Sequence, residues 1–159
     1  MNTLIVYSTK YGCTEKCASI LSKKLMGKVE LCNLKIGSIP NLAEYDKVII
    51  GGSIYIGKIQ KEVSEFCSRN LDVLKDKKIG LFICAMQKDD VIQTEINTAF
   101  PQELLARATA REHFGGEFIF KNMNFLDRMI VKKVSKIDKD TSNIIEINID
   151  KLSQLMNNP

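Results

Sequence analysis

The residues with the clearest chemical potential form one short loop, Ser8-Thr9-Lys10-Tyr11-Gly12-Cys13-Thr14, between an apolar run and an amphipathic segment. If the run is a strand and the segment a helix, the loop meets free backbone N–H groups and the positive end of a helix dipole. Such a place binds anions, above all phosphate. Thr9 and Thr14 can donate hydroxyl hydrogen bonds, and Gly12 allows the backbone to approach a ligand closely. The alternative is a helix that Thr9 or Thr14 merely caps.

Three other classes of phosphate-binding protein each require a residue that this chain does not have. A cysteine-dependent phosphatase built on Cys13 would need an arginine where Ser19 stands. A response-regulator receiver would need acidic Mg²⁺ ligands at the end of the first strand, where Tyr7-Ser8 stands. The stretch from Gly51 to Lys58 imitates a P-loop, but Ile59 replaces the Ser or Thr that would hold Mg²⁺. Phosphoryl transfer and nucleotide hydrolysis are therefore disfavoured.

Segments typical of strands and of helices alternate along the chain. Short β-branched or alternating runs predict strands at residues 3–7, 28–33, 47–50, 78–85 and 113–120. Apolar residues at helical spacing predict helices at residues 14–25, 60–71, 89–100, 124–137 and 150–156. This alternation predicts an α/β fold, a doubly wound five-stranded parallel sheet with helices on both faces. Ligands of such sheets bind beyond the carboxyl ends of the strands, so the loops after the first, third and fourth strands are the informative ones.

The first loop and its flanks resemble the signature of the flavodoxin family. The matching residues are Ile5-Val6-Tyr7-Ser8-Thr9-Lys10-Tyr11-Gly12-Cys13-Thr14, followed by Ala18 and Ile20. In flavodoxins this loop wraps the phosphate of flavin mononucleotide (FMN), so the resemblance implies a flavodoxin-like fold that binds FMN noncovalently. Flavodoxins commonly carry Thr-Gly-Asn-Thr where this chain has Tyr11-Gly12-Cys13-Thr14, which removes a side-chain donor at two positions. Tyr11 and Lys10 partly compensate for that loss.

The resemblance implies that three loops hold the flavin. The first would bind the phosphate, and Tyr55 in the second would lie against the ring while Gly57 gives the backbone freedom beside the flavin N5. Backbone amides of the third would contact the pyrimidine edge of the ring. The implied cofactor-binding residues are Thr9, Lys10, Tyr11, Gly12, Cys13, Thr14, Ser53, Ile54, Tyr55, Ile56, Gly57, Lys58, Ala85, Met86 and Gln87. No catalytic side chain and no metal site is implied, because the redox chemistry would belong to the cofactor.

No aromatic residue stands between Met86 and Phe100. Flavodoxins often place a tyrosine of this loop over the outer face of the ring, so the resemblance implies that this face is open here, or covered by Met86.

Three stretches are similar to one subfamily, the flavodoxin-like, menaquinone-dependent protoporphyrinogen IX dehydrogenases. They are residues 45–50, 51–58 and 125–133. The resemblance implies an FMN-dependent oxidoreductase that passes electrons from a small reduced substrate to a quinone or another redox partner. The chain is shorter than those enzymes between the fourth and fifth strands, where substrate contacts would lie. Two alternatives are an electron-carrying flavodoxin without a substrate of its own and a flavin-free binding module of the same fold.

The segment from Lys121 to Lys139 has an apolar side and a basic side. On a helical wheel the apolar stripe consists of Met123, Leu126, Ile130, Val134 and Ile137. The opposite stripe consists of Lys121, Arg128, Lys132, Lys136 and Lys139. One interpretation is a core helix with a solvated basic face. The other is contact of Arg128, Lys132 and Lys136 with anionic lipid headgroups or an acidic partner.

The composition fits a soluble globular protein with one domain, residues 1–159. A net charge of +4 is too small to require nucleic acid, and it argues against the acidic electron shuttles that steer towards basic partners. The five cysteines form no CxxC pair, and His113, the single histidine, is predicted to be structural. No stretch reads as a signal peptide or a membrane span. We therefore expect a cytoplasmic protein. If the basic stripe contacts lipid, the protein would be attached peripherally to the inner face of the membrane.

Overall fold

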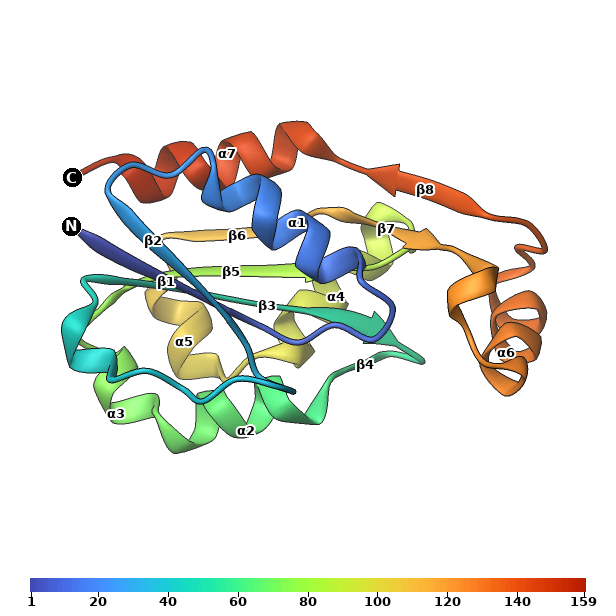
Figure 1. Cartoon of the computed structure of the whole chain (residues 1–159), viewed down its shortest axis with the longest axis horizontal. Helices are drawn as coiled ribbons and strands as arrows, with labels where there is room; N and C mark the ends of the chain where they lie inside the picture. The colour runs from blue at the N-terminus through green and yellow to red at the C-terminus, as the bar shows by residue number, and fades with distance from the viewer.

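Five parallel strands form the centre of this computed structural model, which describes residues 1–159 apart from the side chain of residue 135. Their order is β2-β1-β3-β5-β6, and the short β4 pairs antiparallel with β3. β7 and β8 form a separate two-stranded antiparallel sheet beyond the carboxyl end of the main sheet (Figure 1). We call this pair the β7–β8 hairpin, although α6 lies in the connection between its strands. The strands are β1 (Asn2–Tyr7), β2 (Lys28–Asn33), β3 (Lys47–Tyr55), β4 (Lys58–Ile59), β5 (Lys78–Cys84), β6 (Ala110–His113), β7 (Gly115–Phe118) and β8 (Thr141–Ile144). The predicted doubly wound parallel sheet is confirmed.

Helices cover both faces of the sheet. α1 and α7 lie on one face, α2 to α5 lie on the other, and α6 stands beside the β7–β8 hairpin (Figure 1). The helices are α1 (Cys13–Ser22), α2 (Lys61–Arg69), α3 (Leu71–Leu74), α4 (Asp89–Ala99), α5 (Gln102–Arg107), α6 (Phe125–Ser135) and α7 (Glu146–Asn157), with short 3-10 turns at Leu42–Glu44 and Phe120–Asn122. Within the described residues, no helix combines the length and the apolar character that crossing a bilayer requires.

The apolar runs became strands because both of their faces are buried. Ile5 in β1 and Ile49 in β3 are paired in the parallel register and are fully buried. On the side covered by α1 and α7, Phe82 stacks on Phe114 with ring centroids 4.5 Å apart. Gly51 leaves room for this pair, since a Cβ at that position would lie 2.0 Å from the ring of Phe82. The sheet is therefore a packed platform that fixes the loops at its carboxyl edge.

The fifth parallel strand begins earlier than the sequence predicts. The prediction placed it at residues 113–120, whereas β6 spans Ala110–His113 at the edge of the sheet. An edge strand with the sequence Ala-Arg-Glu-His carries almost no apolar signal. The apolar run that follows leaves the sheet at Gly115, which has φ 75°, and forms the hairpin with β8 instead. This hairpin supplies a wall of the site described below.

Candidate functional site

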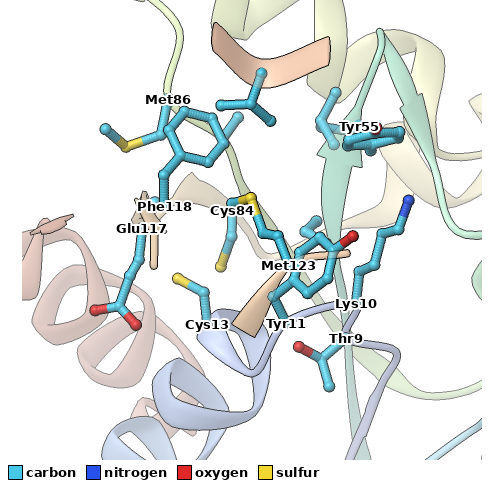
Figure 2. Close-up of a pocket in the computed structure, with 15 residues that line it drawn as sticks. Thr9, Lys10, Tyr11, Cys13, Tyr55, Cys84, Met86, Glu117, Phe118 and Met123 are labelled. Carbon is cyan, nitrogen blue, oxygen red and sulfur yellow. The ribbon is translucent and has the colours of Figure 1, made fainter. Parts of the chain in front are cut away.

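A cleft opens where the loops after β1, β3 and β5 meet, at the edge of the sheet predicted to bind a ligand. Its smaller part, of about 60 Å³, lies against the loop after β1 and against Cys13 and Cys84 (Figure 2). Its larger part, of about 600 Å³, lies between the loops after β3 and β5 and helix α6. Tyr55 and Met86 border both parts. The two cavities therefore form one elongated site.

The loop after β1 leads into α1 through a glycine, and two hydroxyl groups near this point have no hydrogen-bond partner among the described residues. Gly12 precedes α1 with φ 96°, and its N–H donates to Thr9 Oγ1 at 2.9 Å. The prediction that Thr9 or Thr14 caps α1 is wrong, because Gly12 occupies the N-cap position. Within the described part of the chain, the buried Thr14 Oγ1 and Tyr11 Oη have no hydrogen-bond partner. Tyr11 borders the smaller part of the cleft, whereas Thr14 is fully buried and borders neither part. Buried hydroxyl groups are rarely left unpaired, so both offer hydrogen bonds that the described residues do not use.

Three charged or polar side chains from distant segments meet at the mouth of this loop. Lys10 Nζ lies 3.1 Å from Asp127 Oδ2 and 3.6 Å from the centroid of the Tyr55 ring. The Tyr55 hydroxyl donates to Asp127 Oδ1 at 2.6 Å. Asp127 is buried at the start of α6 and its role was missed, because only the folded chain brings it to Lys10 and Tyr55. The three residues tie the loops after β1 and β3 to α6.

The loop after β3 is a two-residue hairpin turn between paired Tyr55 and Lys58. Ile56 and Gly57 both have positive φ, 50° and 72°, as a type I′ turn requires. Isoleucine rarely adopts this conformation, and strained residues of this kind cluster at ligand sites. Ser53, predicted to contact the ligand, has its backbone N–H bonded to Gln60 Oε1 at 2.9 Å. Gln60 Nε2 also donates to the Ser53 hydroxyl oxygen, so Ser53 borders the smaller part of the cleft with both groups already bonded within the protein.

The loop after β5 forms the opposite side of the cleft. The Ala85 N–H donates to the Gly115 carbonyl at 2.8 Å, which joins this loop to β7. Met86 is half-buried, and Gln87 is exposed at the rim of the larger part. A Cβ on Gly116 would lie 2.8 Å from Met86 Cγ, so the glycine allows the loop to pack closely on the hairpin.

An outer wall that the sequence did not reveal closes the cleft. Phe118 from β7, Met123 from the segment before α6 and Val131 from α6 border it together with Met86. The sequence predicted an outer face that is open or covered by Met86. Met86 lies in this wall with these three apolar side chains, and no contact between their segment and the loop after β5 was predicted from the sequence.

Two titratable side chains border the cleft in unusual states. Glu95 of α4 is buried, and burial raises the pKa of its carboxyl group. Its Oε2 atom has no hydrogen-bond partner among the described residues. Hydrogen bonds from the thiols of Cys17 and Cys84 lower the pKa of the Cys13 thiol. Neither Glu95 nor the contact between the cysteines was predicted, since both depend on packing across the sheet.

The side chains that α6 buries are not those of the predicted apolar stripe. Its buried side chains are Asp127 and Val131, whereas Leu126 and Val134 are each 66% exposed. The interpretation as a core helix is therefore wrong. Arg128 Nε donates to the Phe120 carbonyl at 2.5 Å, and Lys132 Nζ lies 5.5 Å from the centroid of the Phe120 ring. The outer face carries a row of exposed apolar side chains, Phe125, Leu126, Met129 and Val134.

Known proteins resemble this chain in sequence and in fold. Protoporphyrinogen IX dehydrogenase (quinone) of Escherichia coli K12 is 23% identical over 145 residues, which cover 86% of this chain and 80% of that protein. The flavodoxin of Streptococcus pneumoniae superposes with a TM-score of 0.55 at 16% identity, over 98% of this chain and 94% of that one. The two-electron-reduced flavodoxin of Megasphaera elsdenii gives 0.52 at 21% identity, over 70% of this chain and 84% of that one. A model of the flavodoxin domain matches residues 4–144, and the chain therefore belongs to the flavodoxin-domain family.

Proposed function

We propose that the chain is one FMN-binding domain that passes electrons from a reduced substrate to a quinone or another acceptor. The cleft carries the proposal, because Tyr11, whose hydroxyl group is unpaired among the described residues, borders it near the N-terminus of α1, and its larger part is an elongated, mainly apolar cavity. Bound FMN would supply the electron-transfer chemistry. The distant relationship to an enzyme named for quinone-dependent protoporphyrinogen oxidation supports the choice of acceptor.

The residues of the first loop fit a phosphate group. Thr14 and Tyr11 offer hydroxyl groups that lack other partners among the described residues. The first N–H groups of α1 have no partner within the helix and favour a dianion there. Lys10 adds positive charge at the same end, where it now pairs with Asp127. The other predicted loop residues, Thr9, Gly12 and Cys13, would shape the backbone around the phosphate.

The larger part of the cleft fits a flat apolar ring. Tyr55 offers an aromatic face, and its bond to Asp127 fixes the orientation of that face. Met86, Phe118 and Val131 would exclude water from the opposite side. Lys10 covers one face of Tyr55, so stacking on that face requires Lys10 to turn away. Glu95, whose buried carboxyl group has a raised pKa, would hold a proton beside the cavity for a substrate or quinone.

A spectrum and an assay test this function. The purified protein, or the protein mixed with FMN, should show the absorbance of a bound flavin and release FMN on denaturation. Oxidation of protoporphyrinogen that depends on added menaquinone analogue would support the oxidoreductase. Rapid reduction by a flavodoxin reductase without that activity would support an electron carrier. If the protein does not bind FMN at micromolar concentration, both the oxidoreductase and the electron carrier are excluded.

Removing the aromatic ring of Tyr55 should weaken FMN binding. We expect Tyr55→Ala to lower the affinity by about 1–3 kcal/mol, from lost stacking and buried area. Tyr55→Phe keeps the ring and loses only the hydroxyl bond to Asp127. Fluorescence titration with FMN should find Tyr55→Phe close to wild type. Equal losses in the two variants would show that the bond to Asp127, and not the ring, is what FMN binding needs.

We also propose that α6 contacts the surface of an anionic lipid bilayer, whose interior holds lipid-soluble quinones. Phe125 and Met129 are 75% and 54% exposed, and Lys132 and Lys133 are exposed on the same helix. Exposed apolar side chains and exposed lysines on one helix suit the interface of a membrane.

Leu126→Asp should weaken co-sedimentation with anionic vesicles by about tenfold or more, through lost burial of one side chain. Lys132→Glu should weaken it in a salt-dependent way. Ile36→Asp is the control, because Ile36 is 86% exposed in a distant loop. Binding that is insensitive to Leu126→Asp, or equally sensitive to Ile36→Asp, would rule out α6 as the contact.

A further inference from the structure

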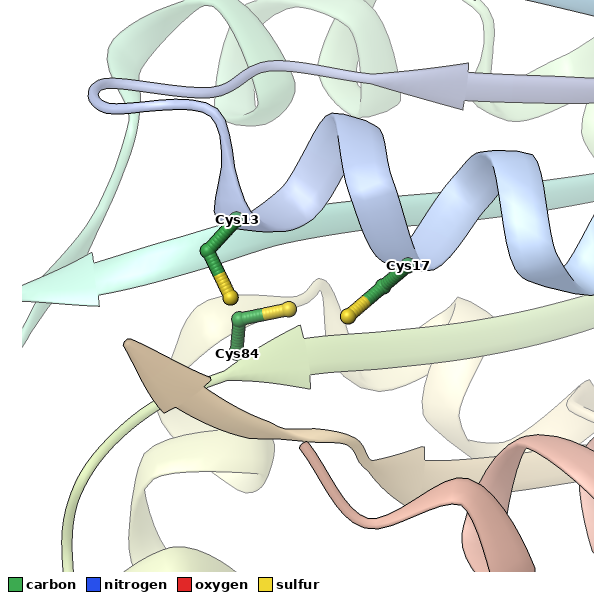
Figure 3. Close-up of side chains that lie close together, drawn as sticks. All are labelled: Cys13, Cys17 and Cys84. Atoms are coloured by element: carbon green, nitrogen blue, oxygen red, sulfur yellow. The ribbon is translucent and has the colours of Figure 1, made fainter. Parts of the chain in front are cut away.

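Three cysteines bring their sulfur atoms together beneath the first loop. Cys13 and Cys17 belong to α1, and Cys84 is the last residue of β5. The three Sγ atoms lie within 4.8 Å of one another, and their side chains point towards one another (Figure 3). Cys13 and Cys84 border the smaller cavity, and Cys17 is fully buried. The cluster is therefore buried but reachable from the cleft.

Secondary structure explains why these sulfur atoms meet. Residues four positions apart lie on one face of a helix, so Cys13 and Cys17 both point from α1 towards the sheet. α1 packs across β1, β3 and β5, and Cys84 ends β5 directly below the first turn of the helix (Figure 3). The site thus rests on two rigid elements rather than on a loop, which favours a defined geometry.

We propose that Cys13, Cys17 and Cys84 bind copper(I) through three thiolates. This group of ligand atoms contains sulfur alone among the described residues, with no imidazole nitrogen or carboxylate oxygen. Soft thiolate ligands select soft ions such as Cu(I). Cu(I) is satisfied by three sulfur ligands, whereas structural Zn²⁺ sites take four. Three sulfur atoms without a fourth donor therefore suit copper better than zinc.

The spacing of the sulfur atoms is close to what a metal ion requires. Metal–thiolate bonds of about 2.3 Å place three coplanar sulfur atoms about 4 Å apart. Separations of at most 4.8 Å reach that arrangement through small side-chain rotations. The ion would enter through the smaller cavity, past Cys13 and Cys84. The cavity gives the ion an entry path to ligands that the folded chain already brings together.

The binding step is a ligand exchange. Each Cu–S bond forms as an S–H proton leaves for water, and copper stays monovalent, so no oxidant or reductant is consumed. The three thiolates give the complex a net negative charge. The N-terminus of α1, where Cys13 is the first helical residue, stabilises that charge. The site does not depend on the proposed FMN binding and is tested without the flavin.

The test is an anaerobic titration of the purified chain with Cu(I) against a chromophoric Cu(I) chelator. We expect one copper ion per chain and a rise in the thermal unfolding midpoint. Cys17→Ala and Cys84→Ala should each weaken retention by at least about 10–100-fold and abolish the rise. Cys67→Ala is the matched control, because Cys67 is equally buried but lies outside the cluster. Circular dichroism of each copper-free variant checks that it folds.

Three results would overturn the proposal. The first is copper that the chelator removes completely from the wild-type protein. The second is an equal loss in Cys67→Ala and Cys17→Ala, which would place the ion elsewhere. The third is Zn²⁺ retained as strongly as Cu(I) in matched competitions, which would reject copper as the ion. If copper is not retained, the three thiols act as small core side chains only.

Discussion

Replacing Thr14 by valine should stabilise the flavin-free protein and weaken FMN binding at the same time. Thr14 Oγ1 is buried without a partner among the described residues, which costs about 1–3 kcal/mol. Valine has nearly the same shape and no hydroxyl group, so we expect the free energy of unfolding to rise by about 1 kcal/mol. The variant loses a charge-assisted hydrogen bond to phosphate, worth about 1.5–3 kcal/mol. Affinity for FMN should therefore fall by about one to two orders of magnitude.

Thr3 provides a control for this prediction. Its hydroxyl group is also buried without a partner in the described part of the chain, and Thr3 lies near the start of β1, at the end of the strand opposite the loop that carries Thr14. Thr3→Val should therefore raise stability as Thr14→Val does, and leave FMN affinity unchanged. Urea unfolding of the flavin-free protein and fluorescence titration with FMN measure the two quantities. An unchanged FMN affinity in Thr14→Val would remove Thr14 from the proposed phosphate site.

The largest loss of stability should follow from Gly115→Ala at the start of β7. Gly115 has φ 75°, and a Cβ there would lie 1.8 Å from the backbone carbonyl oxygen of Asn143 in β8. The left-handed conformation alone costs a non-glycine residue about 1–2 kcal/mol. Because the clash is with paired backbone, relief requires the hairpin to separate. We expect a total loss above about 3 kcal/mol, or a protein whose hairpin no longer forms.

Gly57→Ala separates conformational strain from the clash. Gly57 has nearly the same φ, 72°, and a Cβ there would meet no atom within 4 Å. The free energy of unfolding of Gly57→Ala should be only about 1–2 kcal/mol below that of the wild-type protein. Urea unfolding of both flavin-free variants gives the comparison. Equal losses at the two positions would mean that the β7–β8 pairing adjusts to the new side chain.

The local features of the site could be predicted from the sequence, because local chemistry determines them. Hydroxyl groups and a glycine between an apolar run and a helix predicted the loop from Ser8 to Thr14, and Thr9, Lys10, Tyr11 and Cys13 of this loop border the cleft. The positive φ at Gly57 likewise matches the backbone freedom expected there. These residues act through the conformation of their own segment.

The parts that the sequence did not reveal depend on distant contacts. Asp127 is a buried carboxylate because Lys10 and Tyr55 reach it across the fold. β6 is polar because it lies at the edge of the sheet, so its apolar signal was absent. Leu126 and Val134 lie on an apolar stripe, but α6 turns Asp127 and Val131 inward instead. A helical wheel shows which residues share a face, and only tertiary packing decides which face is buried.

The hairpin and α6 have a consequence for how such proteins diversify. β7 pairs only with β8 among the described strands, and both lie outside the sheet that holds the hydrophobic cores. Substitutions in this appendage can reshape the entrance to the cleft while the platform beneath it keeps its packing. Exposed positions of the appendage, such as Leu126 and Met129, can therefore vary with the redox partner, whereas Phe118 and Val131 are constrained by the cleft that they border.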